Sequence, residues 1–83
     1  MDKSVFTKEY EVFRQLLRET REQQGVTQVE LAALLGETQS FVSKCERGER
    51  RLDVVQARAF CQVLGVKFLD LMQEFEKRLS KRR

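Results

Sequence analysis

Apolar residues recur every three or four positions along most of the chain, which is the spacing of one face of an α-helix. Between about Lys8 and Gln24 this face is formed by Tyr10, Phe13, Leu16 and Leu17. Arg and Glu side chains occupy the other positions, and Gly25 follows the last turn. The pattern predicts a first helix that packs by this face against the rest of the molecule.

Two shorter helices are predicted in the segment from Gln28 to Arg47, QVELAALLGETQSFVSKCER. Gly36 divides the segment, and a glycine takes a positive φ without the steric penalty of a Cβ atom. Ala32 supplies the small side chain needed where two helices cross at roughly 90 to 120°. The segment therefore has the layout of a helix-turn-helix.

Capping residues and apolar spacing place the remaining helix ends. Thr27, with Glu30 in a capping box, and Thr38 are predicted to cap the two short helices. Asp53 is predicted to cap a fourth helix, which Gly65 ends. The residues expected to be buried on it are Val55, Ala59, Val63 and Leu64. A fifth helix is predicted in VKFLDLMQEFEKRL, whose apolar stripe is Phe68, Leu69, Leu71, Met72, Phe75 and Leu79.

Composition agrees with an all-helical chain. There is no proline, and Glu, Gln, Leu, Arg and Lys, which are frequent, lose little rotamer freedom in helices. At 83 residues the chain allows a single domain, 1–83, with a modest core and no room for an enzyme with its own substrate pocket. We therefore predict an all-α, five-helix bundle that is not an enzyme.

Positive charge is concentrated at the C-terminal end. The net charge is +3, but residues 77–83, KRLSKRR, hold five basic and no acidic residues. The rest of the chain has 11 Lys and Arg against 13 Asp and Glu, a net charge of −2. The body is therefore not a general polyanion binder. The basic C-terminal tail is either a second phosphate contact or a frayed helix end. Basic residues at a helix C-terminus need no ligand to explain them, because the helix dipole also favours positive charge there.

The two cysteines and the absence of histidine leave no set of four zinc ligands, so neither a metal nor another cofactor is expected. Cys45 and Cys61 are expected to be small, reduced core residues. No segment is long enough to cross a membrane, and Met1 to Tyr10 lacks the apolar run of a signal peptide. A cytoplasmic location is therefore predicted.

The outer face of the second short helix is polar and carries no acid. It consists of Gln39, Ser40, Ser43, Lys44 and Arg47. Amides, hydroxyls and basic groups are those that bond base edges and phosphates, whereas a helical hairpin without such a ligand would carry acids there as often. The face therefore favours double-stranded DNA as the partner, and no small-molecule ligand is evident.

The chain also shares a sequence pattern with a known family. The stretch TQVELAALLGETQSFVSKCERGER holds an initial Gln, a Leu-Ala pair, a turn Gly and a Ser-x-x-Glu-x-Gly ending, at Gln28, Leu31, Ala32, Gly36, Ser43, Glu46 and Gly48. In this pattern it resembles the phage repressor and Cro-type helix-turn-helix proteins, the XRE family, from about Phe13 to Phe75. The resemblance implies a lambda-repressor-like bundle and a structural pair of Arg21 with Glu46. Leu52, where relatives often have proline, departs from the pattern.

A DNA-binding role assigns a task to each residue of this region. The predicted DNA-binding residues are Gln28, Thr38, Gln39, Ser40, Phe41, Ser43, Lys44, Arg47, Arg50 and Arg51. Gln39 can bond adenine N7 and N6 together, Lys44 suits guanine O6 and N7, and Gln28 would bond a phosphate. Phe41 either meets a thymine methyl or backbone sugar, or folds inward against the first helix.

The fifth helix carries more apolar surface than a domain this small readily covers. Some of this surface closes the monomer core, for which Leu69 is the first candidate, and the rest is interpreted as a two-fold dimer contact. The predicted dimer contact is formed by Phe60, Val66, Phe68, Leu71, Met72 and Phe75.

Two functions remain open. The first is a dimeric, sequence-specific transcriptional regulator on an inverted repeat with half-sites about 34–36 Å apart, such as a Cro-like protein, a restriction-modification controller or an antitoxin. The alternative is a protein-interaction module or antitoxin subunit that docks through the apolar last helix. The acid-free helix face favours the first function, and the net negative body favours the second.

Overall fold

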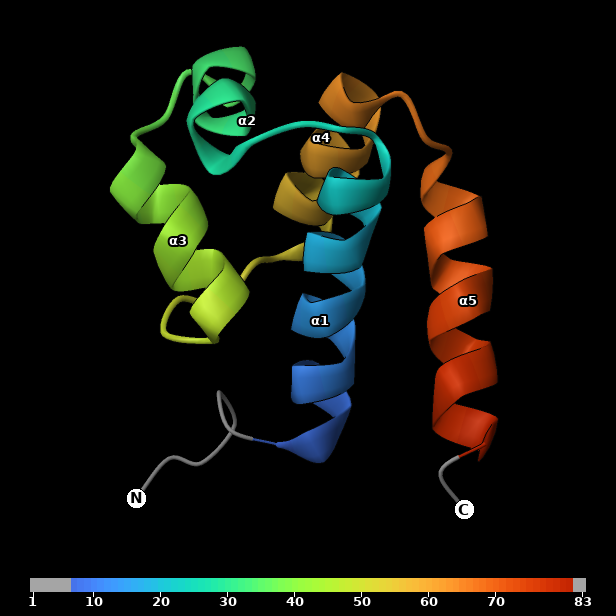
Figure 1. The fold of residues 1–83 in the computed structure, drawn as a ribbon. Helices are drawn as coiled ribbons and strands as arrows, with labels where there is room; N and C mark the ends of the chain where they lie inside the picture. The colour runs from blue at the N-terminus through green and yellow to red at the C-terminus, as the bar shows by residue number, and fades with distance from the viewer. Residues whose placement is uncertain (1–6, 82–83) are drawn as a thin grey trace.

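The computed structural model describes residues 7–81 of the chain, and within them it contains five α-helices (Figure 1). The helices are α1 (Lys8–Gln23), α2 (Gln28–Leu35), α3 (Gln39–Arg47), α4 (Val54–Leu64) and α5 (Phe68–Lys81). The predicted all-α, five-helix fold is confirmed, with the helix-turn-helix formed by α2 and α3.

The helix ends follow the capping chemistry that the sequence predicts. Thr27 and Asp53 each form a capping box, with Glu30 and with Gln56, and the Thr38 hydroxyl accepts from the backbone N–H of Phe41 at 3.1 Å. These bonds satisfy backbone donors that the first turn of a helix leaves without partners. Local chemistry therefore accounts for where each of these helices begins.

Two glycines need the left-handed conformation that ends their helices. Gly36 ends α2 at φ 71°, and Gly48 ends α3 at φ 81°. At Gly48 there is a second constraint, because a Cβ atom would lie 2.9 Å from Cδ and Nε of Arg14. Gly48 therefore lets the α1 side chain of Arg14 cross the end of α3.

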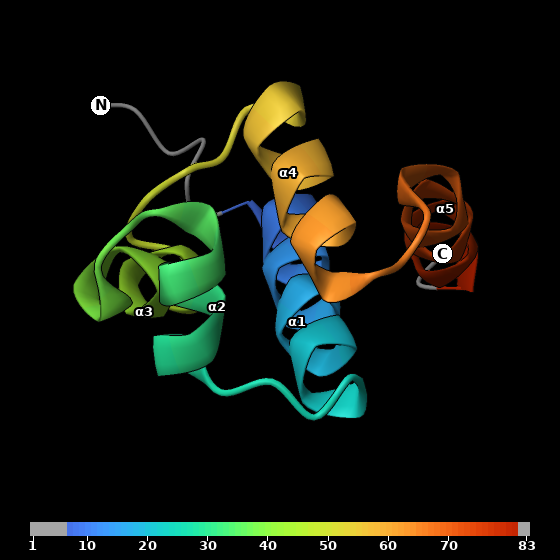
Figure 2. The ribbon, with the colours of Figure 1, turned by 90° about the horizontal axis from the view of Figure 1, so that it is seen from above.

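The helices are arranged around α1, which lies between the helix-turn-helix on one side and α5 on the other (Figures 1 and 2). The α4 helix packs on α2 and also on α5. Figure 2 shows that α3 and α5 lie at opposite sides of the molecule. The two helices thus present their outer faces in different directions.

One apolar core joins these helices. Its buried members come from every helix and are Tyr10, Phe13, Leu16, Leu17, Leu31, Ala32, Val42, Cys45, Ala57, Phe60, Cys61, Leu64 and Leu71. Both cysteines are free thiols, and burial raises the pKa of Cys45 to about 11. The prediction that both are core residues is confirmed, and a thiol with so high a pKa is unreactive at neutral pH.

Several apolar residues of α4 and α5 lie on other faces than the sequence predicts. Val55 and Leu69, both expected to be buried, are 72% and 74% exposed. The inward face of α4 instead begins at Ala57. Val55 precedes Ala57 by two positions, and at 3.6 residues per turn it therefore lies on the opposite side of the helix. Phe60 and Leu71 are 2% and 5% exposed, so the prediction that they form a dimer contact is wrong.

Besides the apolar packing of Leu71, an aromatic contact and an ion pair join the last helix to α1. The rings of Phe13 and Phe75 meet edge to face at 5.5 Å. Arg78 donates to Glu19 of α1 at 2.8 Å and to Glu74 at 3.0 Å. The α5 helix runs to Lys81, so residues 77–81 of the basic C-terminal tail form its last turn. Residues 82 and 83 lie outside the described part of the chain. No helix among the described residues is both long and apolar enough to cross a membrane.

Candidate nucleic-acid interface

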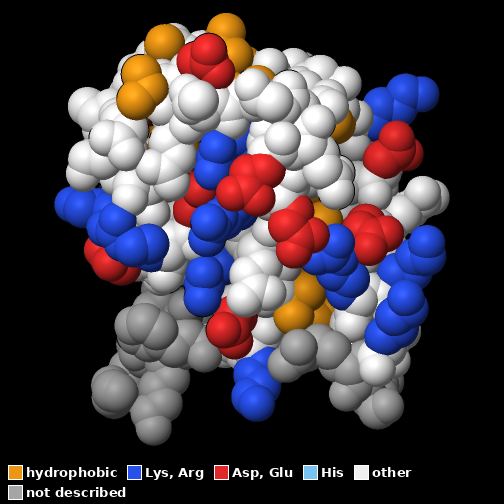
Figure 3. All heavy atoms as spheres, viewed as in Figure 1, with side chains coloured by type: hydrophobic (Ala, Val, Ile, Leu, Met, Phe, Trp, Pro, Cys, Tyr) orange, Lys and Arg blue, Asp and Glu red, His pale blue; other side chains and the backbone are white. Residues whose placement is uncertain are grey.

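The outer face of α3 is polar and lacks an acidic side chain. Four of its residues are exposed, namely Gln39, Ser40, Lys44 and Arg47, and Ser43 is half-buried. Glu46 is the acidic residue of this helix, and it is buried on the opposite face with Val42 and Cys45. Figure 3 shows Lys and Arg side chains over α3 and along its seam with α1, with Asp and Glu side chains among them. Tertiary structure thus removes the negative charge of α3 from the surface.

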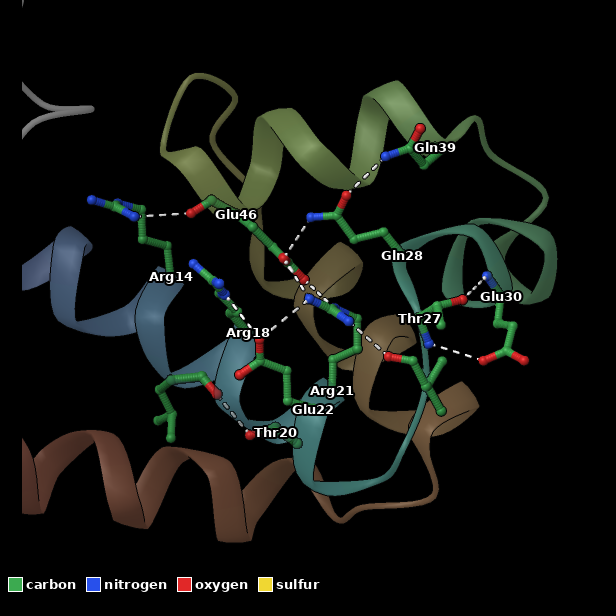
Figure 4. Close-up of polar contacts among 12 residues, drawn as sticks. Arg14, Arg18, Thr20, Arg21, Glu22, Thr27, Gln28, Glu30, Gln39 and Glu46 are labelled. Carbon is green, nitrogen blue, oxygen red and sulfur yellow. Dashed lines mark hydrogen bonds and ion pairs between the residues drawn. The ribbon is translucent and has the colours of Figure 1, made fainter.

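A buried ion pair fixes α3 to α1 (Figure 4). Arg21 donates from Nε to Glu46 Oε2 at 2.6 Å and from Nη2 to Glu46 Oε1 at 3.0 Å. Its remaining Nη1 donates to the carbonyl oxygen of Val26 at 2.7 Å, and hydrogen bonding to Glu46 raises the pKa of Arg21. Arg14 adds a bond from Nη1 to the backbone oxygen of Glu46 at 2.9 Å. This bidentate geometry sets the orientation of α3.

A chain of amide hydrogen bonds leads from that ion pair to the exposed face (Figure 4). Gln28 Nε2 donates to Glu46 Oε1 at 2.9 Å, and Gln39 Nε2 donates to Gln28 Oε1 at 2.9 Å. Gln28, expected to meet a phosphate, therefore already bonds two side chains in the free protein. Gln39 projects from the first turn of α3 with one side of its amide held.

The basic residues after α3 are also held in place. Arg47 donates to Glu49 at 2.8 Å and to the Ser43 hydroxyl, and the hydrogen bond from Arg47 lowers the pKa of Glu49. The guanidinium groups of Arg50 and Arg51 lie over aromatic rings, 5.0 Å from the centroid of Phe41 and 4.7 Å from that of Tyr10. Cation–π attraction of this kind restricts the arginine rotamers.

Comparisons with known proteins agree with this architecture. A helix-turn-helix family model matches residues 17–71. The chain belongs to the XRE family of helix-turn-helix proteins. An XRE-family like protein from Pseudomonas syringae pv. tomato str. DC3000 is 43% identical, with a TM-score of 0.82 over 92% of this chain and 93% of that one.

Two structures of the clp gene regulator ClgR from Corynebacterium glutamicum are also similar. They are 27% and 25% identical, with TM-scores of 0.75 and 0.79, and they cover 86% and 92% of this chain and 91% and 81% of theirs. No curated protein matched the sequence. Family membership and these neighbours identify a DNA-binding transcription regulator.

The structure of this XRE-family protein also shows which site residues sequence reasoning missed. Tyr10 supports Arg51 and accepts the backbone N–H of Leu52 at 2.9 Å, and Arg14 holds the end of α3. Both residues lie on α1, more than 30 positions from their partners, so no local pattern could reveal them. Phe41, for which the sequence left two alternatives open, is half-buried, and its ring centroid lies 6.4 Å from that of Phe60 on α4.

Proposed function

We propose that this protein acts as a homodimeric, sequence-specific regulator that reads an inverted repeat with α3 in the major groove. The observation that carries the proposal is the acid-free outer face of α3, held in place from behind by the Arg21–Glu46 pair. Helix-turn-helix proteins dock with the N-terminal residues of the second helix at the base edges. A rigidly held α3 gives these residues a defined position relative to the bases.

The first turns of α3 would carry base recognition. Gln39 offers an amide suited to adenine, and Lys44 offers a donor suited to guanine O6 and N7. Ser40 and Ser43 add hydroxyl groups at the same face. Thr38 and Gln28 stand at the N-termini of α3 and α2, where the positive end of each helix dipole favours a phosphate.

Three arginines around the end of α3 would contact phosphates. Arg50 and Arg51 rest on Phe41 and Tyr10, so little side-chain freedom remains to be lost when they bind. Arg47 is paired with the exposed carboxylate of Glu49, which a phosphate would replace. These contacts position the protein on the duplex but distinguish no base.

The outer face of α5 would form the dimer contact, in place of the core residues Phe60 and Leu71. Leu69 is exposed there beside the half-buried Met72, in a shallow depression that Gln73, Glu76, Lys77, Ser80 and Lys81 also line. Apart from Lys81, these positions pair with one another across a two-fold axis that passes between residues 74 and 75. Met72 then meets the Lys77 stem, and Gln73 meets Glu76 of the second copy. Such self-complementarity is what an isologous contact requires.

Selection on a randomised duplex library at about 150 mM salt tests the proposal, because that salt concentration suppresses purely electrostatic binding. Enrichment of an inverted repeat is the expected result. Enrichment of a single half-site would retain α3 as the reading helix and contradict the dimer. Enrichment of no sequence would contradict sequence-specific recognition.

The alternative function as a protein-interaction module or antitoxin subunit is supported by the same exposed Leu69 and by the net charge of −2 outside residues 77–83. In that case α5 would dock a different protein, and duplex selection would enrich nothing. The acid-free face of α3 has no role in this alternative, and for that reason we favour the regulator.

A further inference from the structure

The loop between α3 and α4, residues 48–53, is joined to the two helices that it connects. At its start, two backbone N–H groups of the loop donate to the carbonyl oxygen of Lys44, at 2.9 and 3.2 Å. At its end, Asp53 caps α4. The middle of the loop is held from a different direction, because Arg51 and Leu52 both contact a side chain of α1.

That side chain is Tyr10, and it holds Arg51 at two points. The hydroxyl oxygen of Tyr10 accepts the backbone N–H of Leu52 at 2.9 Å, so it fixes the peptide group that joins Arg51 to Leu52. The guanidinium carbon of Arg51 lies 4.7 Å from the centroid of the same ring. Tyr10 is only 8% exposed, so the ring itself is held by the core. One buried side chain thus restrains both the backbone and the charged end of this arginine.

The first two turns of α1 are built to hold this position. Thr7 caps the helix by accepting the backbone N–H of Tyr10 at 3.1 Å. Arg14, one turn after Tyr10, donates to the backbone oxygen of Glu46 at 2.9 Å (Figure 4). All three α1 residues precede the segment 17–71 that the family model matches. The support therefore lies outside the matched helix-turn-helix unit.

We propose that Tyr10 is a positioning residue for DNA binding, which holds the Arg51 guanidinium where it meets a phosphate of the duplex. The proposal rests on the proposed function of Arg51 as a phosphate contact. A free arginine side chain samples many rotamers and loses that freedom when it binds. Tyr10 removes part of this freedom before DNA arrives. Its effect on affinity is therefore exerted through Arg51 and is the same for every base sequence.

Tyr10→Phe tests this role, because it removes the hydroxyl and keeps the ring that packs on Phe13. Dissociation constants for one duplex are measured with the wild type, Tyr10→Phe, Arg51→Gln and the double variant. Tyr10→Phe should weaken binding about fivefold when Arg51 is present. In the Arg51→Gln background it should change the dissociation constant by less than about twofold, because no guanidinium remains to be positioned.

Two controls separate positioning from a general loss of structure. Gln24→Met removes a bond of the same kind at the other end of α1, from Nε2 to the carbonyl oxygen of Leu64 at 2.9 Å, and should leave DNA affinity unchanged. Arg47→Gln removes another proposed phosphate contact, and Tyr10→Phe should still weaken binding about fivefold in that background. Loss of the effect there as well would overturn the assignment to Arg51.

Two results of the main cycle would overturn the proposal. Equal weakening by Tyr10→Phe with and without Arg51 would give Tyr10 a structural role only. An affinity of Tyr10→Phe within about twofold of the wild type would show that the hydroxyl positions nothing. Thermal melts establish that each variant is folded at the temperature of the titrations.

A measurement on the wild type covers the case in which Tyr10→Phe does not fold. NMR relaxation of the side-chain Nε–H groups should show a more ordered guanidinium for Arg51 than for Arg58, an exposed arginine of α4. Equal order parameters for the two arginines would overturn the proposal.

Failure of sequence-specific regulation gives a different result from failure of the positioning role. A phosphate contact needs no particular base, so the same cycle can be measured on a duplex of mixed sequence at about 50 mM salt when library selection enriches nothing. Coupling between Tyr10 and Arg51 on that duplex would support the positioning role alone. No binding to any duplex would overturn both proposals.

Discussion

The outer faces of α3 and α5 differ in kind, although both helices are amphipathic and lie at opposite sides of α1. On α3 every large apolar residue is buried or half-buried and the acid is turned inward, which leaves amide, hydroxyl and basic groups outside. On α5 the exposed Leu69 stands among residues of both charge signs. The first surface suits a polyanion with hydrogen-bonding edges, and the second suits another protein surface.

The difference comes from what each helix packs against. The inner face of α3 meets α1 and α2 and receives a guanidinium at Glu46, so an acid can be buried there. The α5 helix packs on the rest of the molecule through one face, which carries Leu71, Phe75 and Arg78. No other described residue covers its opposite, outer face. Each of the following experiments alters one of these surfaces and leaves the other intact.

The largest effect is expected at the ion pair behind α3. Arg21→Met or Glu46→Gln alone should cost about 3–5 kcal/mol of folding free energy, because each leaves a buried group without its partner. The double variant should cost less than either single variant. Chemical denaturation measures all three, and Arg18→Met at the exposed Arg18–Glu22 pair is the control, with an expected cost of about 0–1 kcal/mol. Equal stability of the single and double variants would remove the structural assignment.

The next effect should fall on the α5 surface. Leu69→Gln removes an apolar contact twice in a symmetric dimer, so it should weaken dimerisation by about 3 kcal/mol, or about a hundredfold in the dissociation constant. Analytical ultracentrifugation measures this change. Leu34→Gln, at a 56% exposed leucine of α2, should leave the dimer unchanged. The same mass for the wild type and both variants would contradict a dimer through this face.

A smaller effect is expected when glutamine is truncated on each surface. Gln39→Ala on α3 should cost about 1–3 kcal/mol of binding free energy and relax preference at one base pair. Gln73→Ala on α5 should change no base preference, because it lies at the side of the molecule away from α3. Binding to single-substitution operators measures both. A uniform loss across all sequences for Gln39→Ala would reassign that residue to phosphate contact.

The smallest effect concerns the salt dependence of binding. Arg50→Gln should weaken all sequences alike and reduce the slope of log K against log salt by about one unit, since one phosphate contact is lost. Arg58→Gln, on α4 at the corner with α5, is the control and should leave the slope unchanged. Titrations at several salt concentrations measure the slope. An unchanged slope in Arg50→Gln would exclude Arg50 from the phosphate contacts.

Helix ends were the most predictable part of the fold, because capping depends on residues within one turn of each other. Thr27, Thr38 and Asp53 cap as predicted, and Gly36 ends its helix as predicted. The faces of α4 and α5 were less predictable, as Val55 and Leu69 show. Both helices carry apolar residues around more than one face, so periodicity leaves the choice of the inward face to packing.

The sequence by itself determined the five helices, the turn between α2 and α3, and the inventory of polar groups on α3, since these depend on neighbouring residues. Tertiary structure decided which apolar residues of α5 remain outside, where Phe41 packs, and which partners hold Gln28, Arg50 and Arg51. These outcomes depend on how each helix is rotated about its own axis. That rotation is set by the sum of packing contacts between segments far apart in the chain, and no local pattern encodes it.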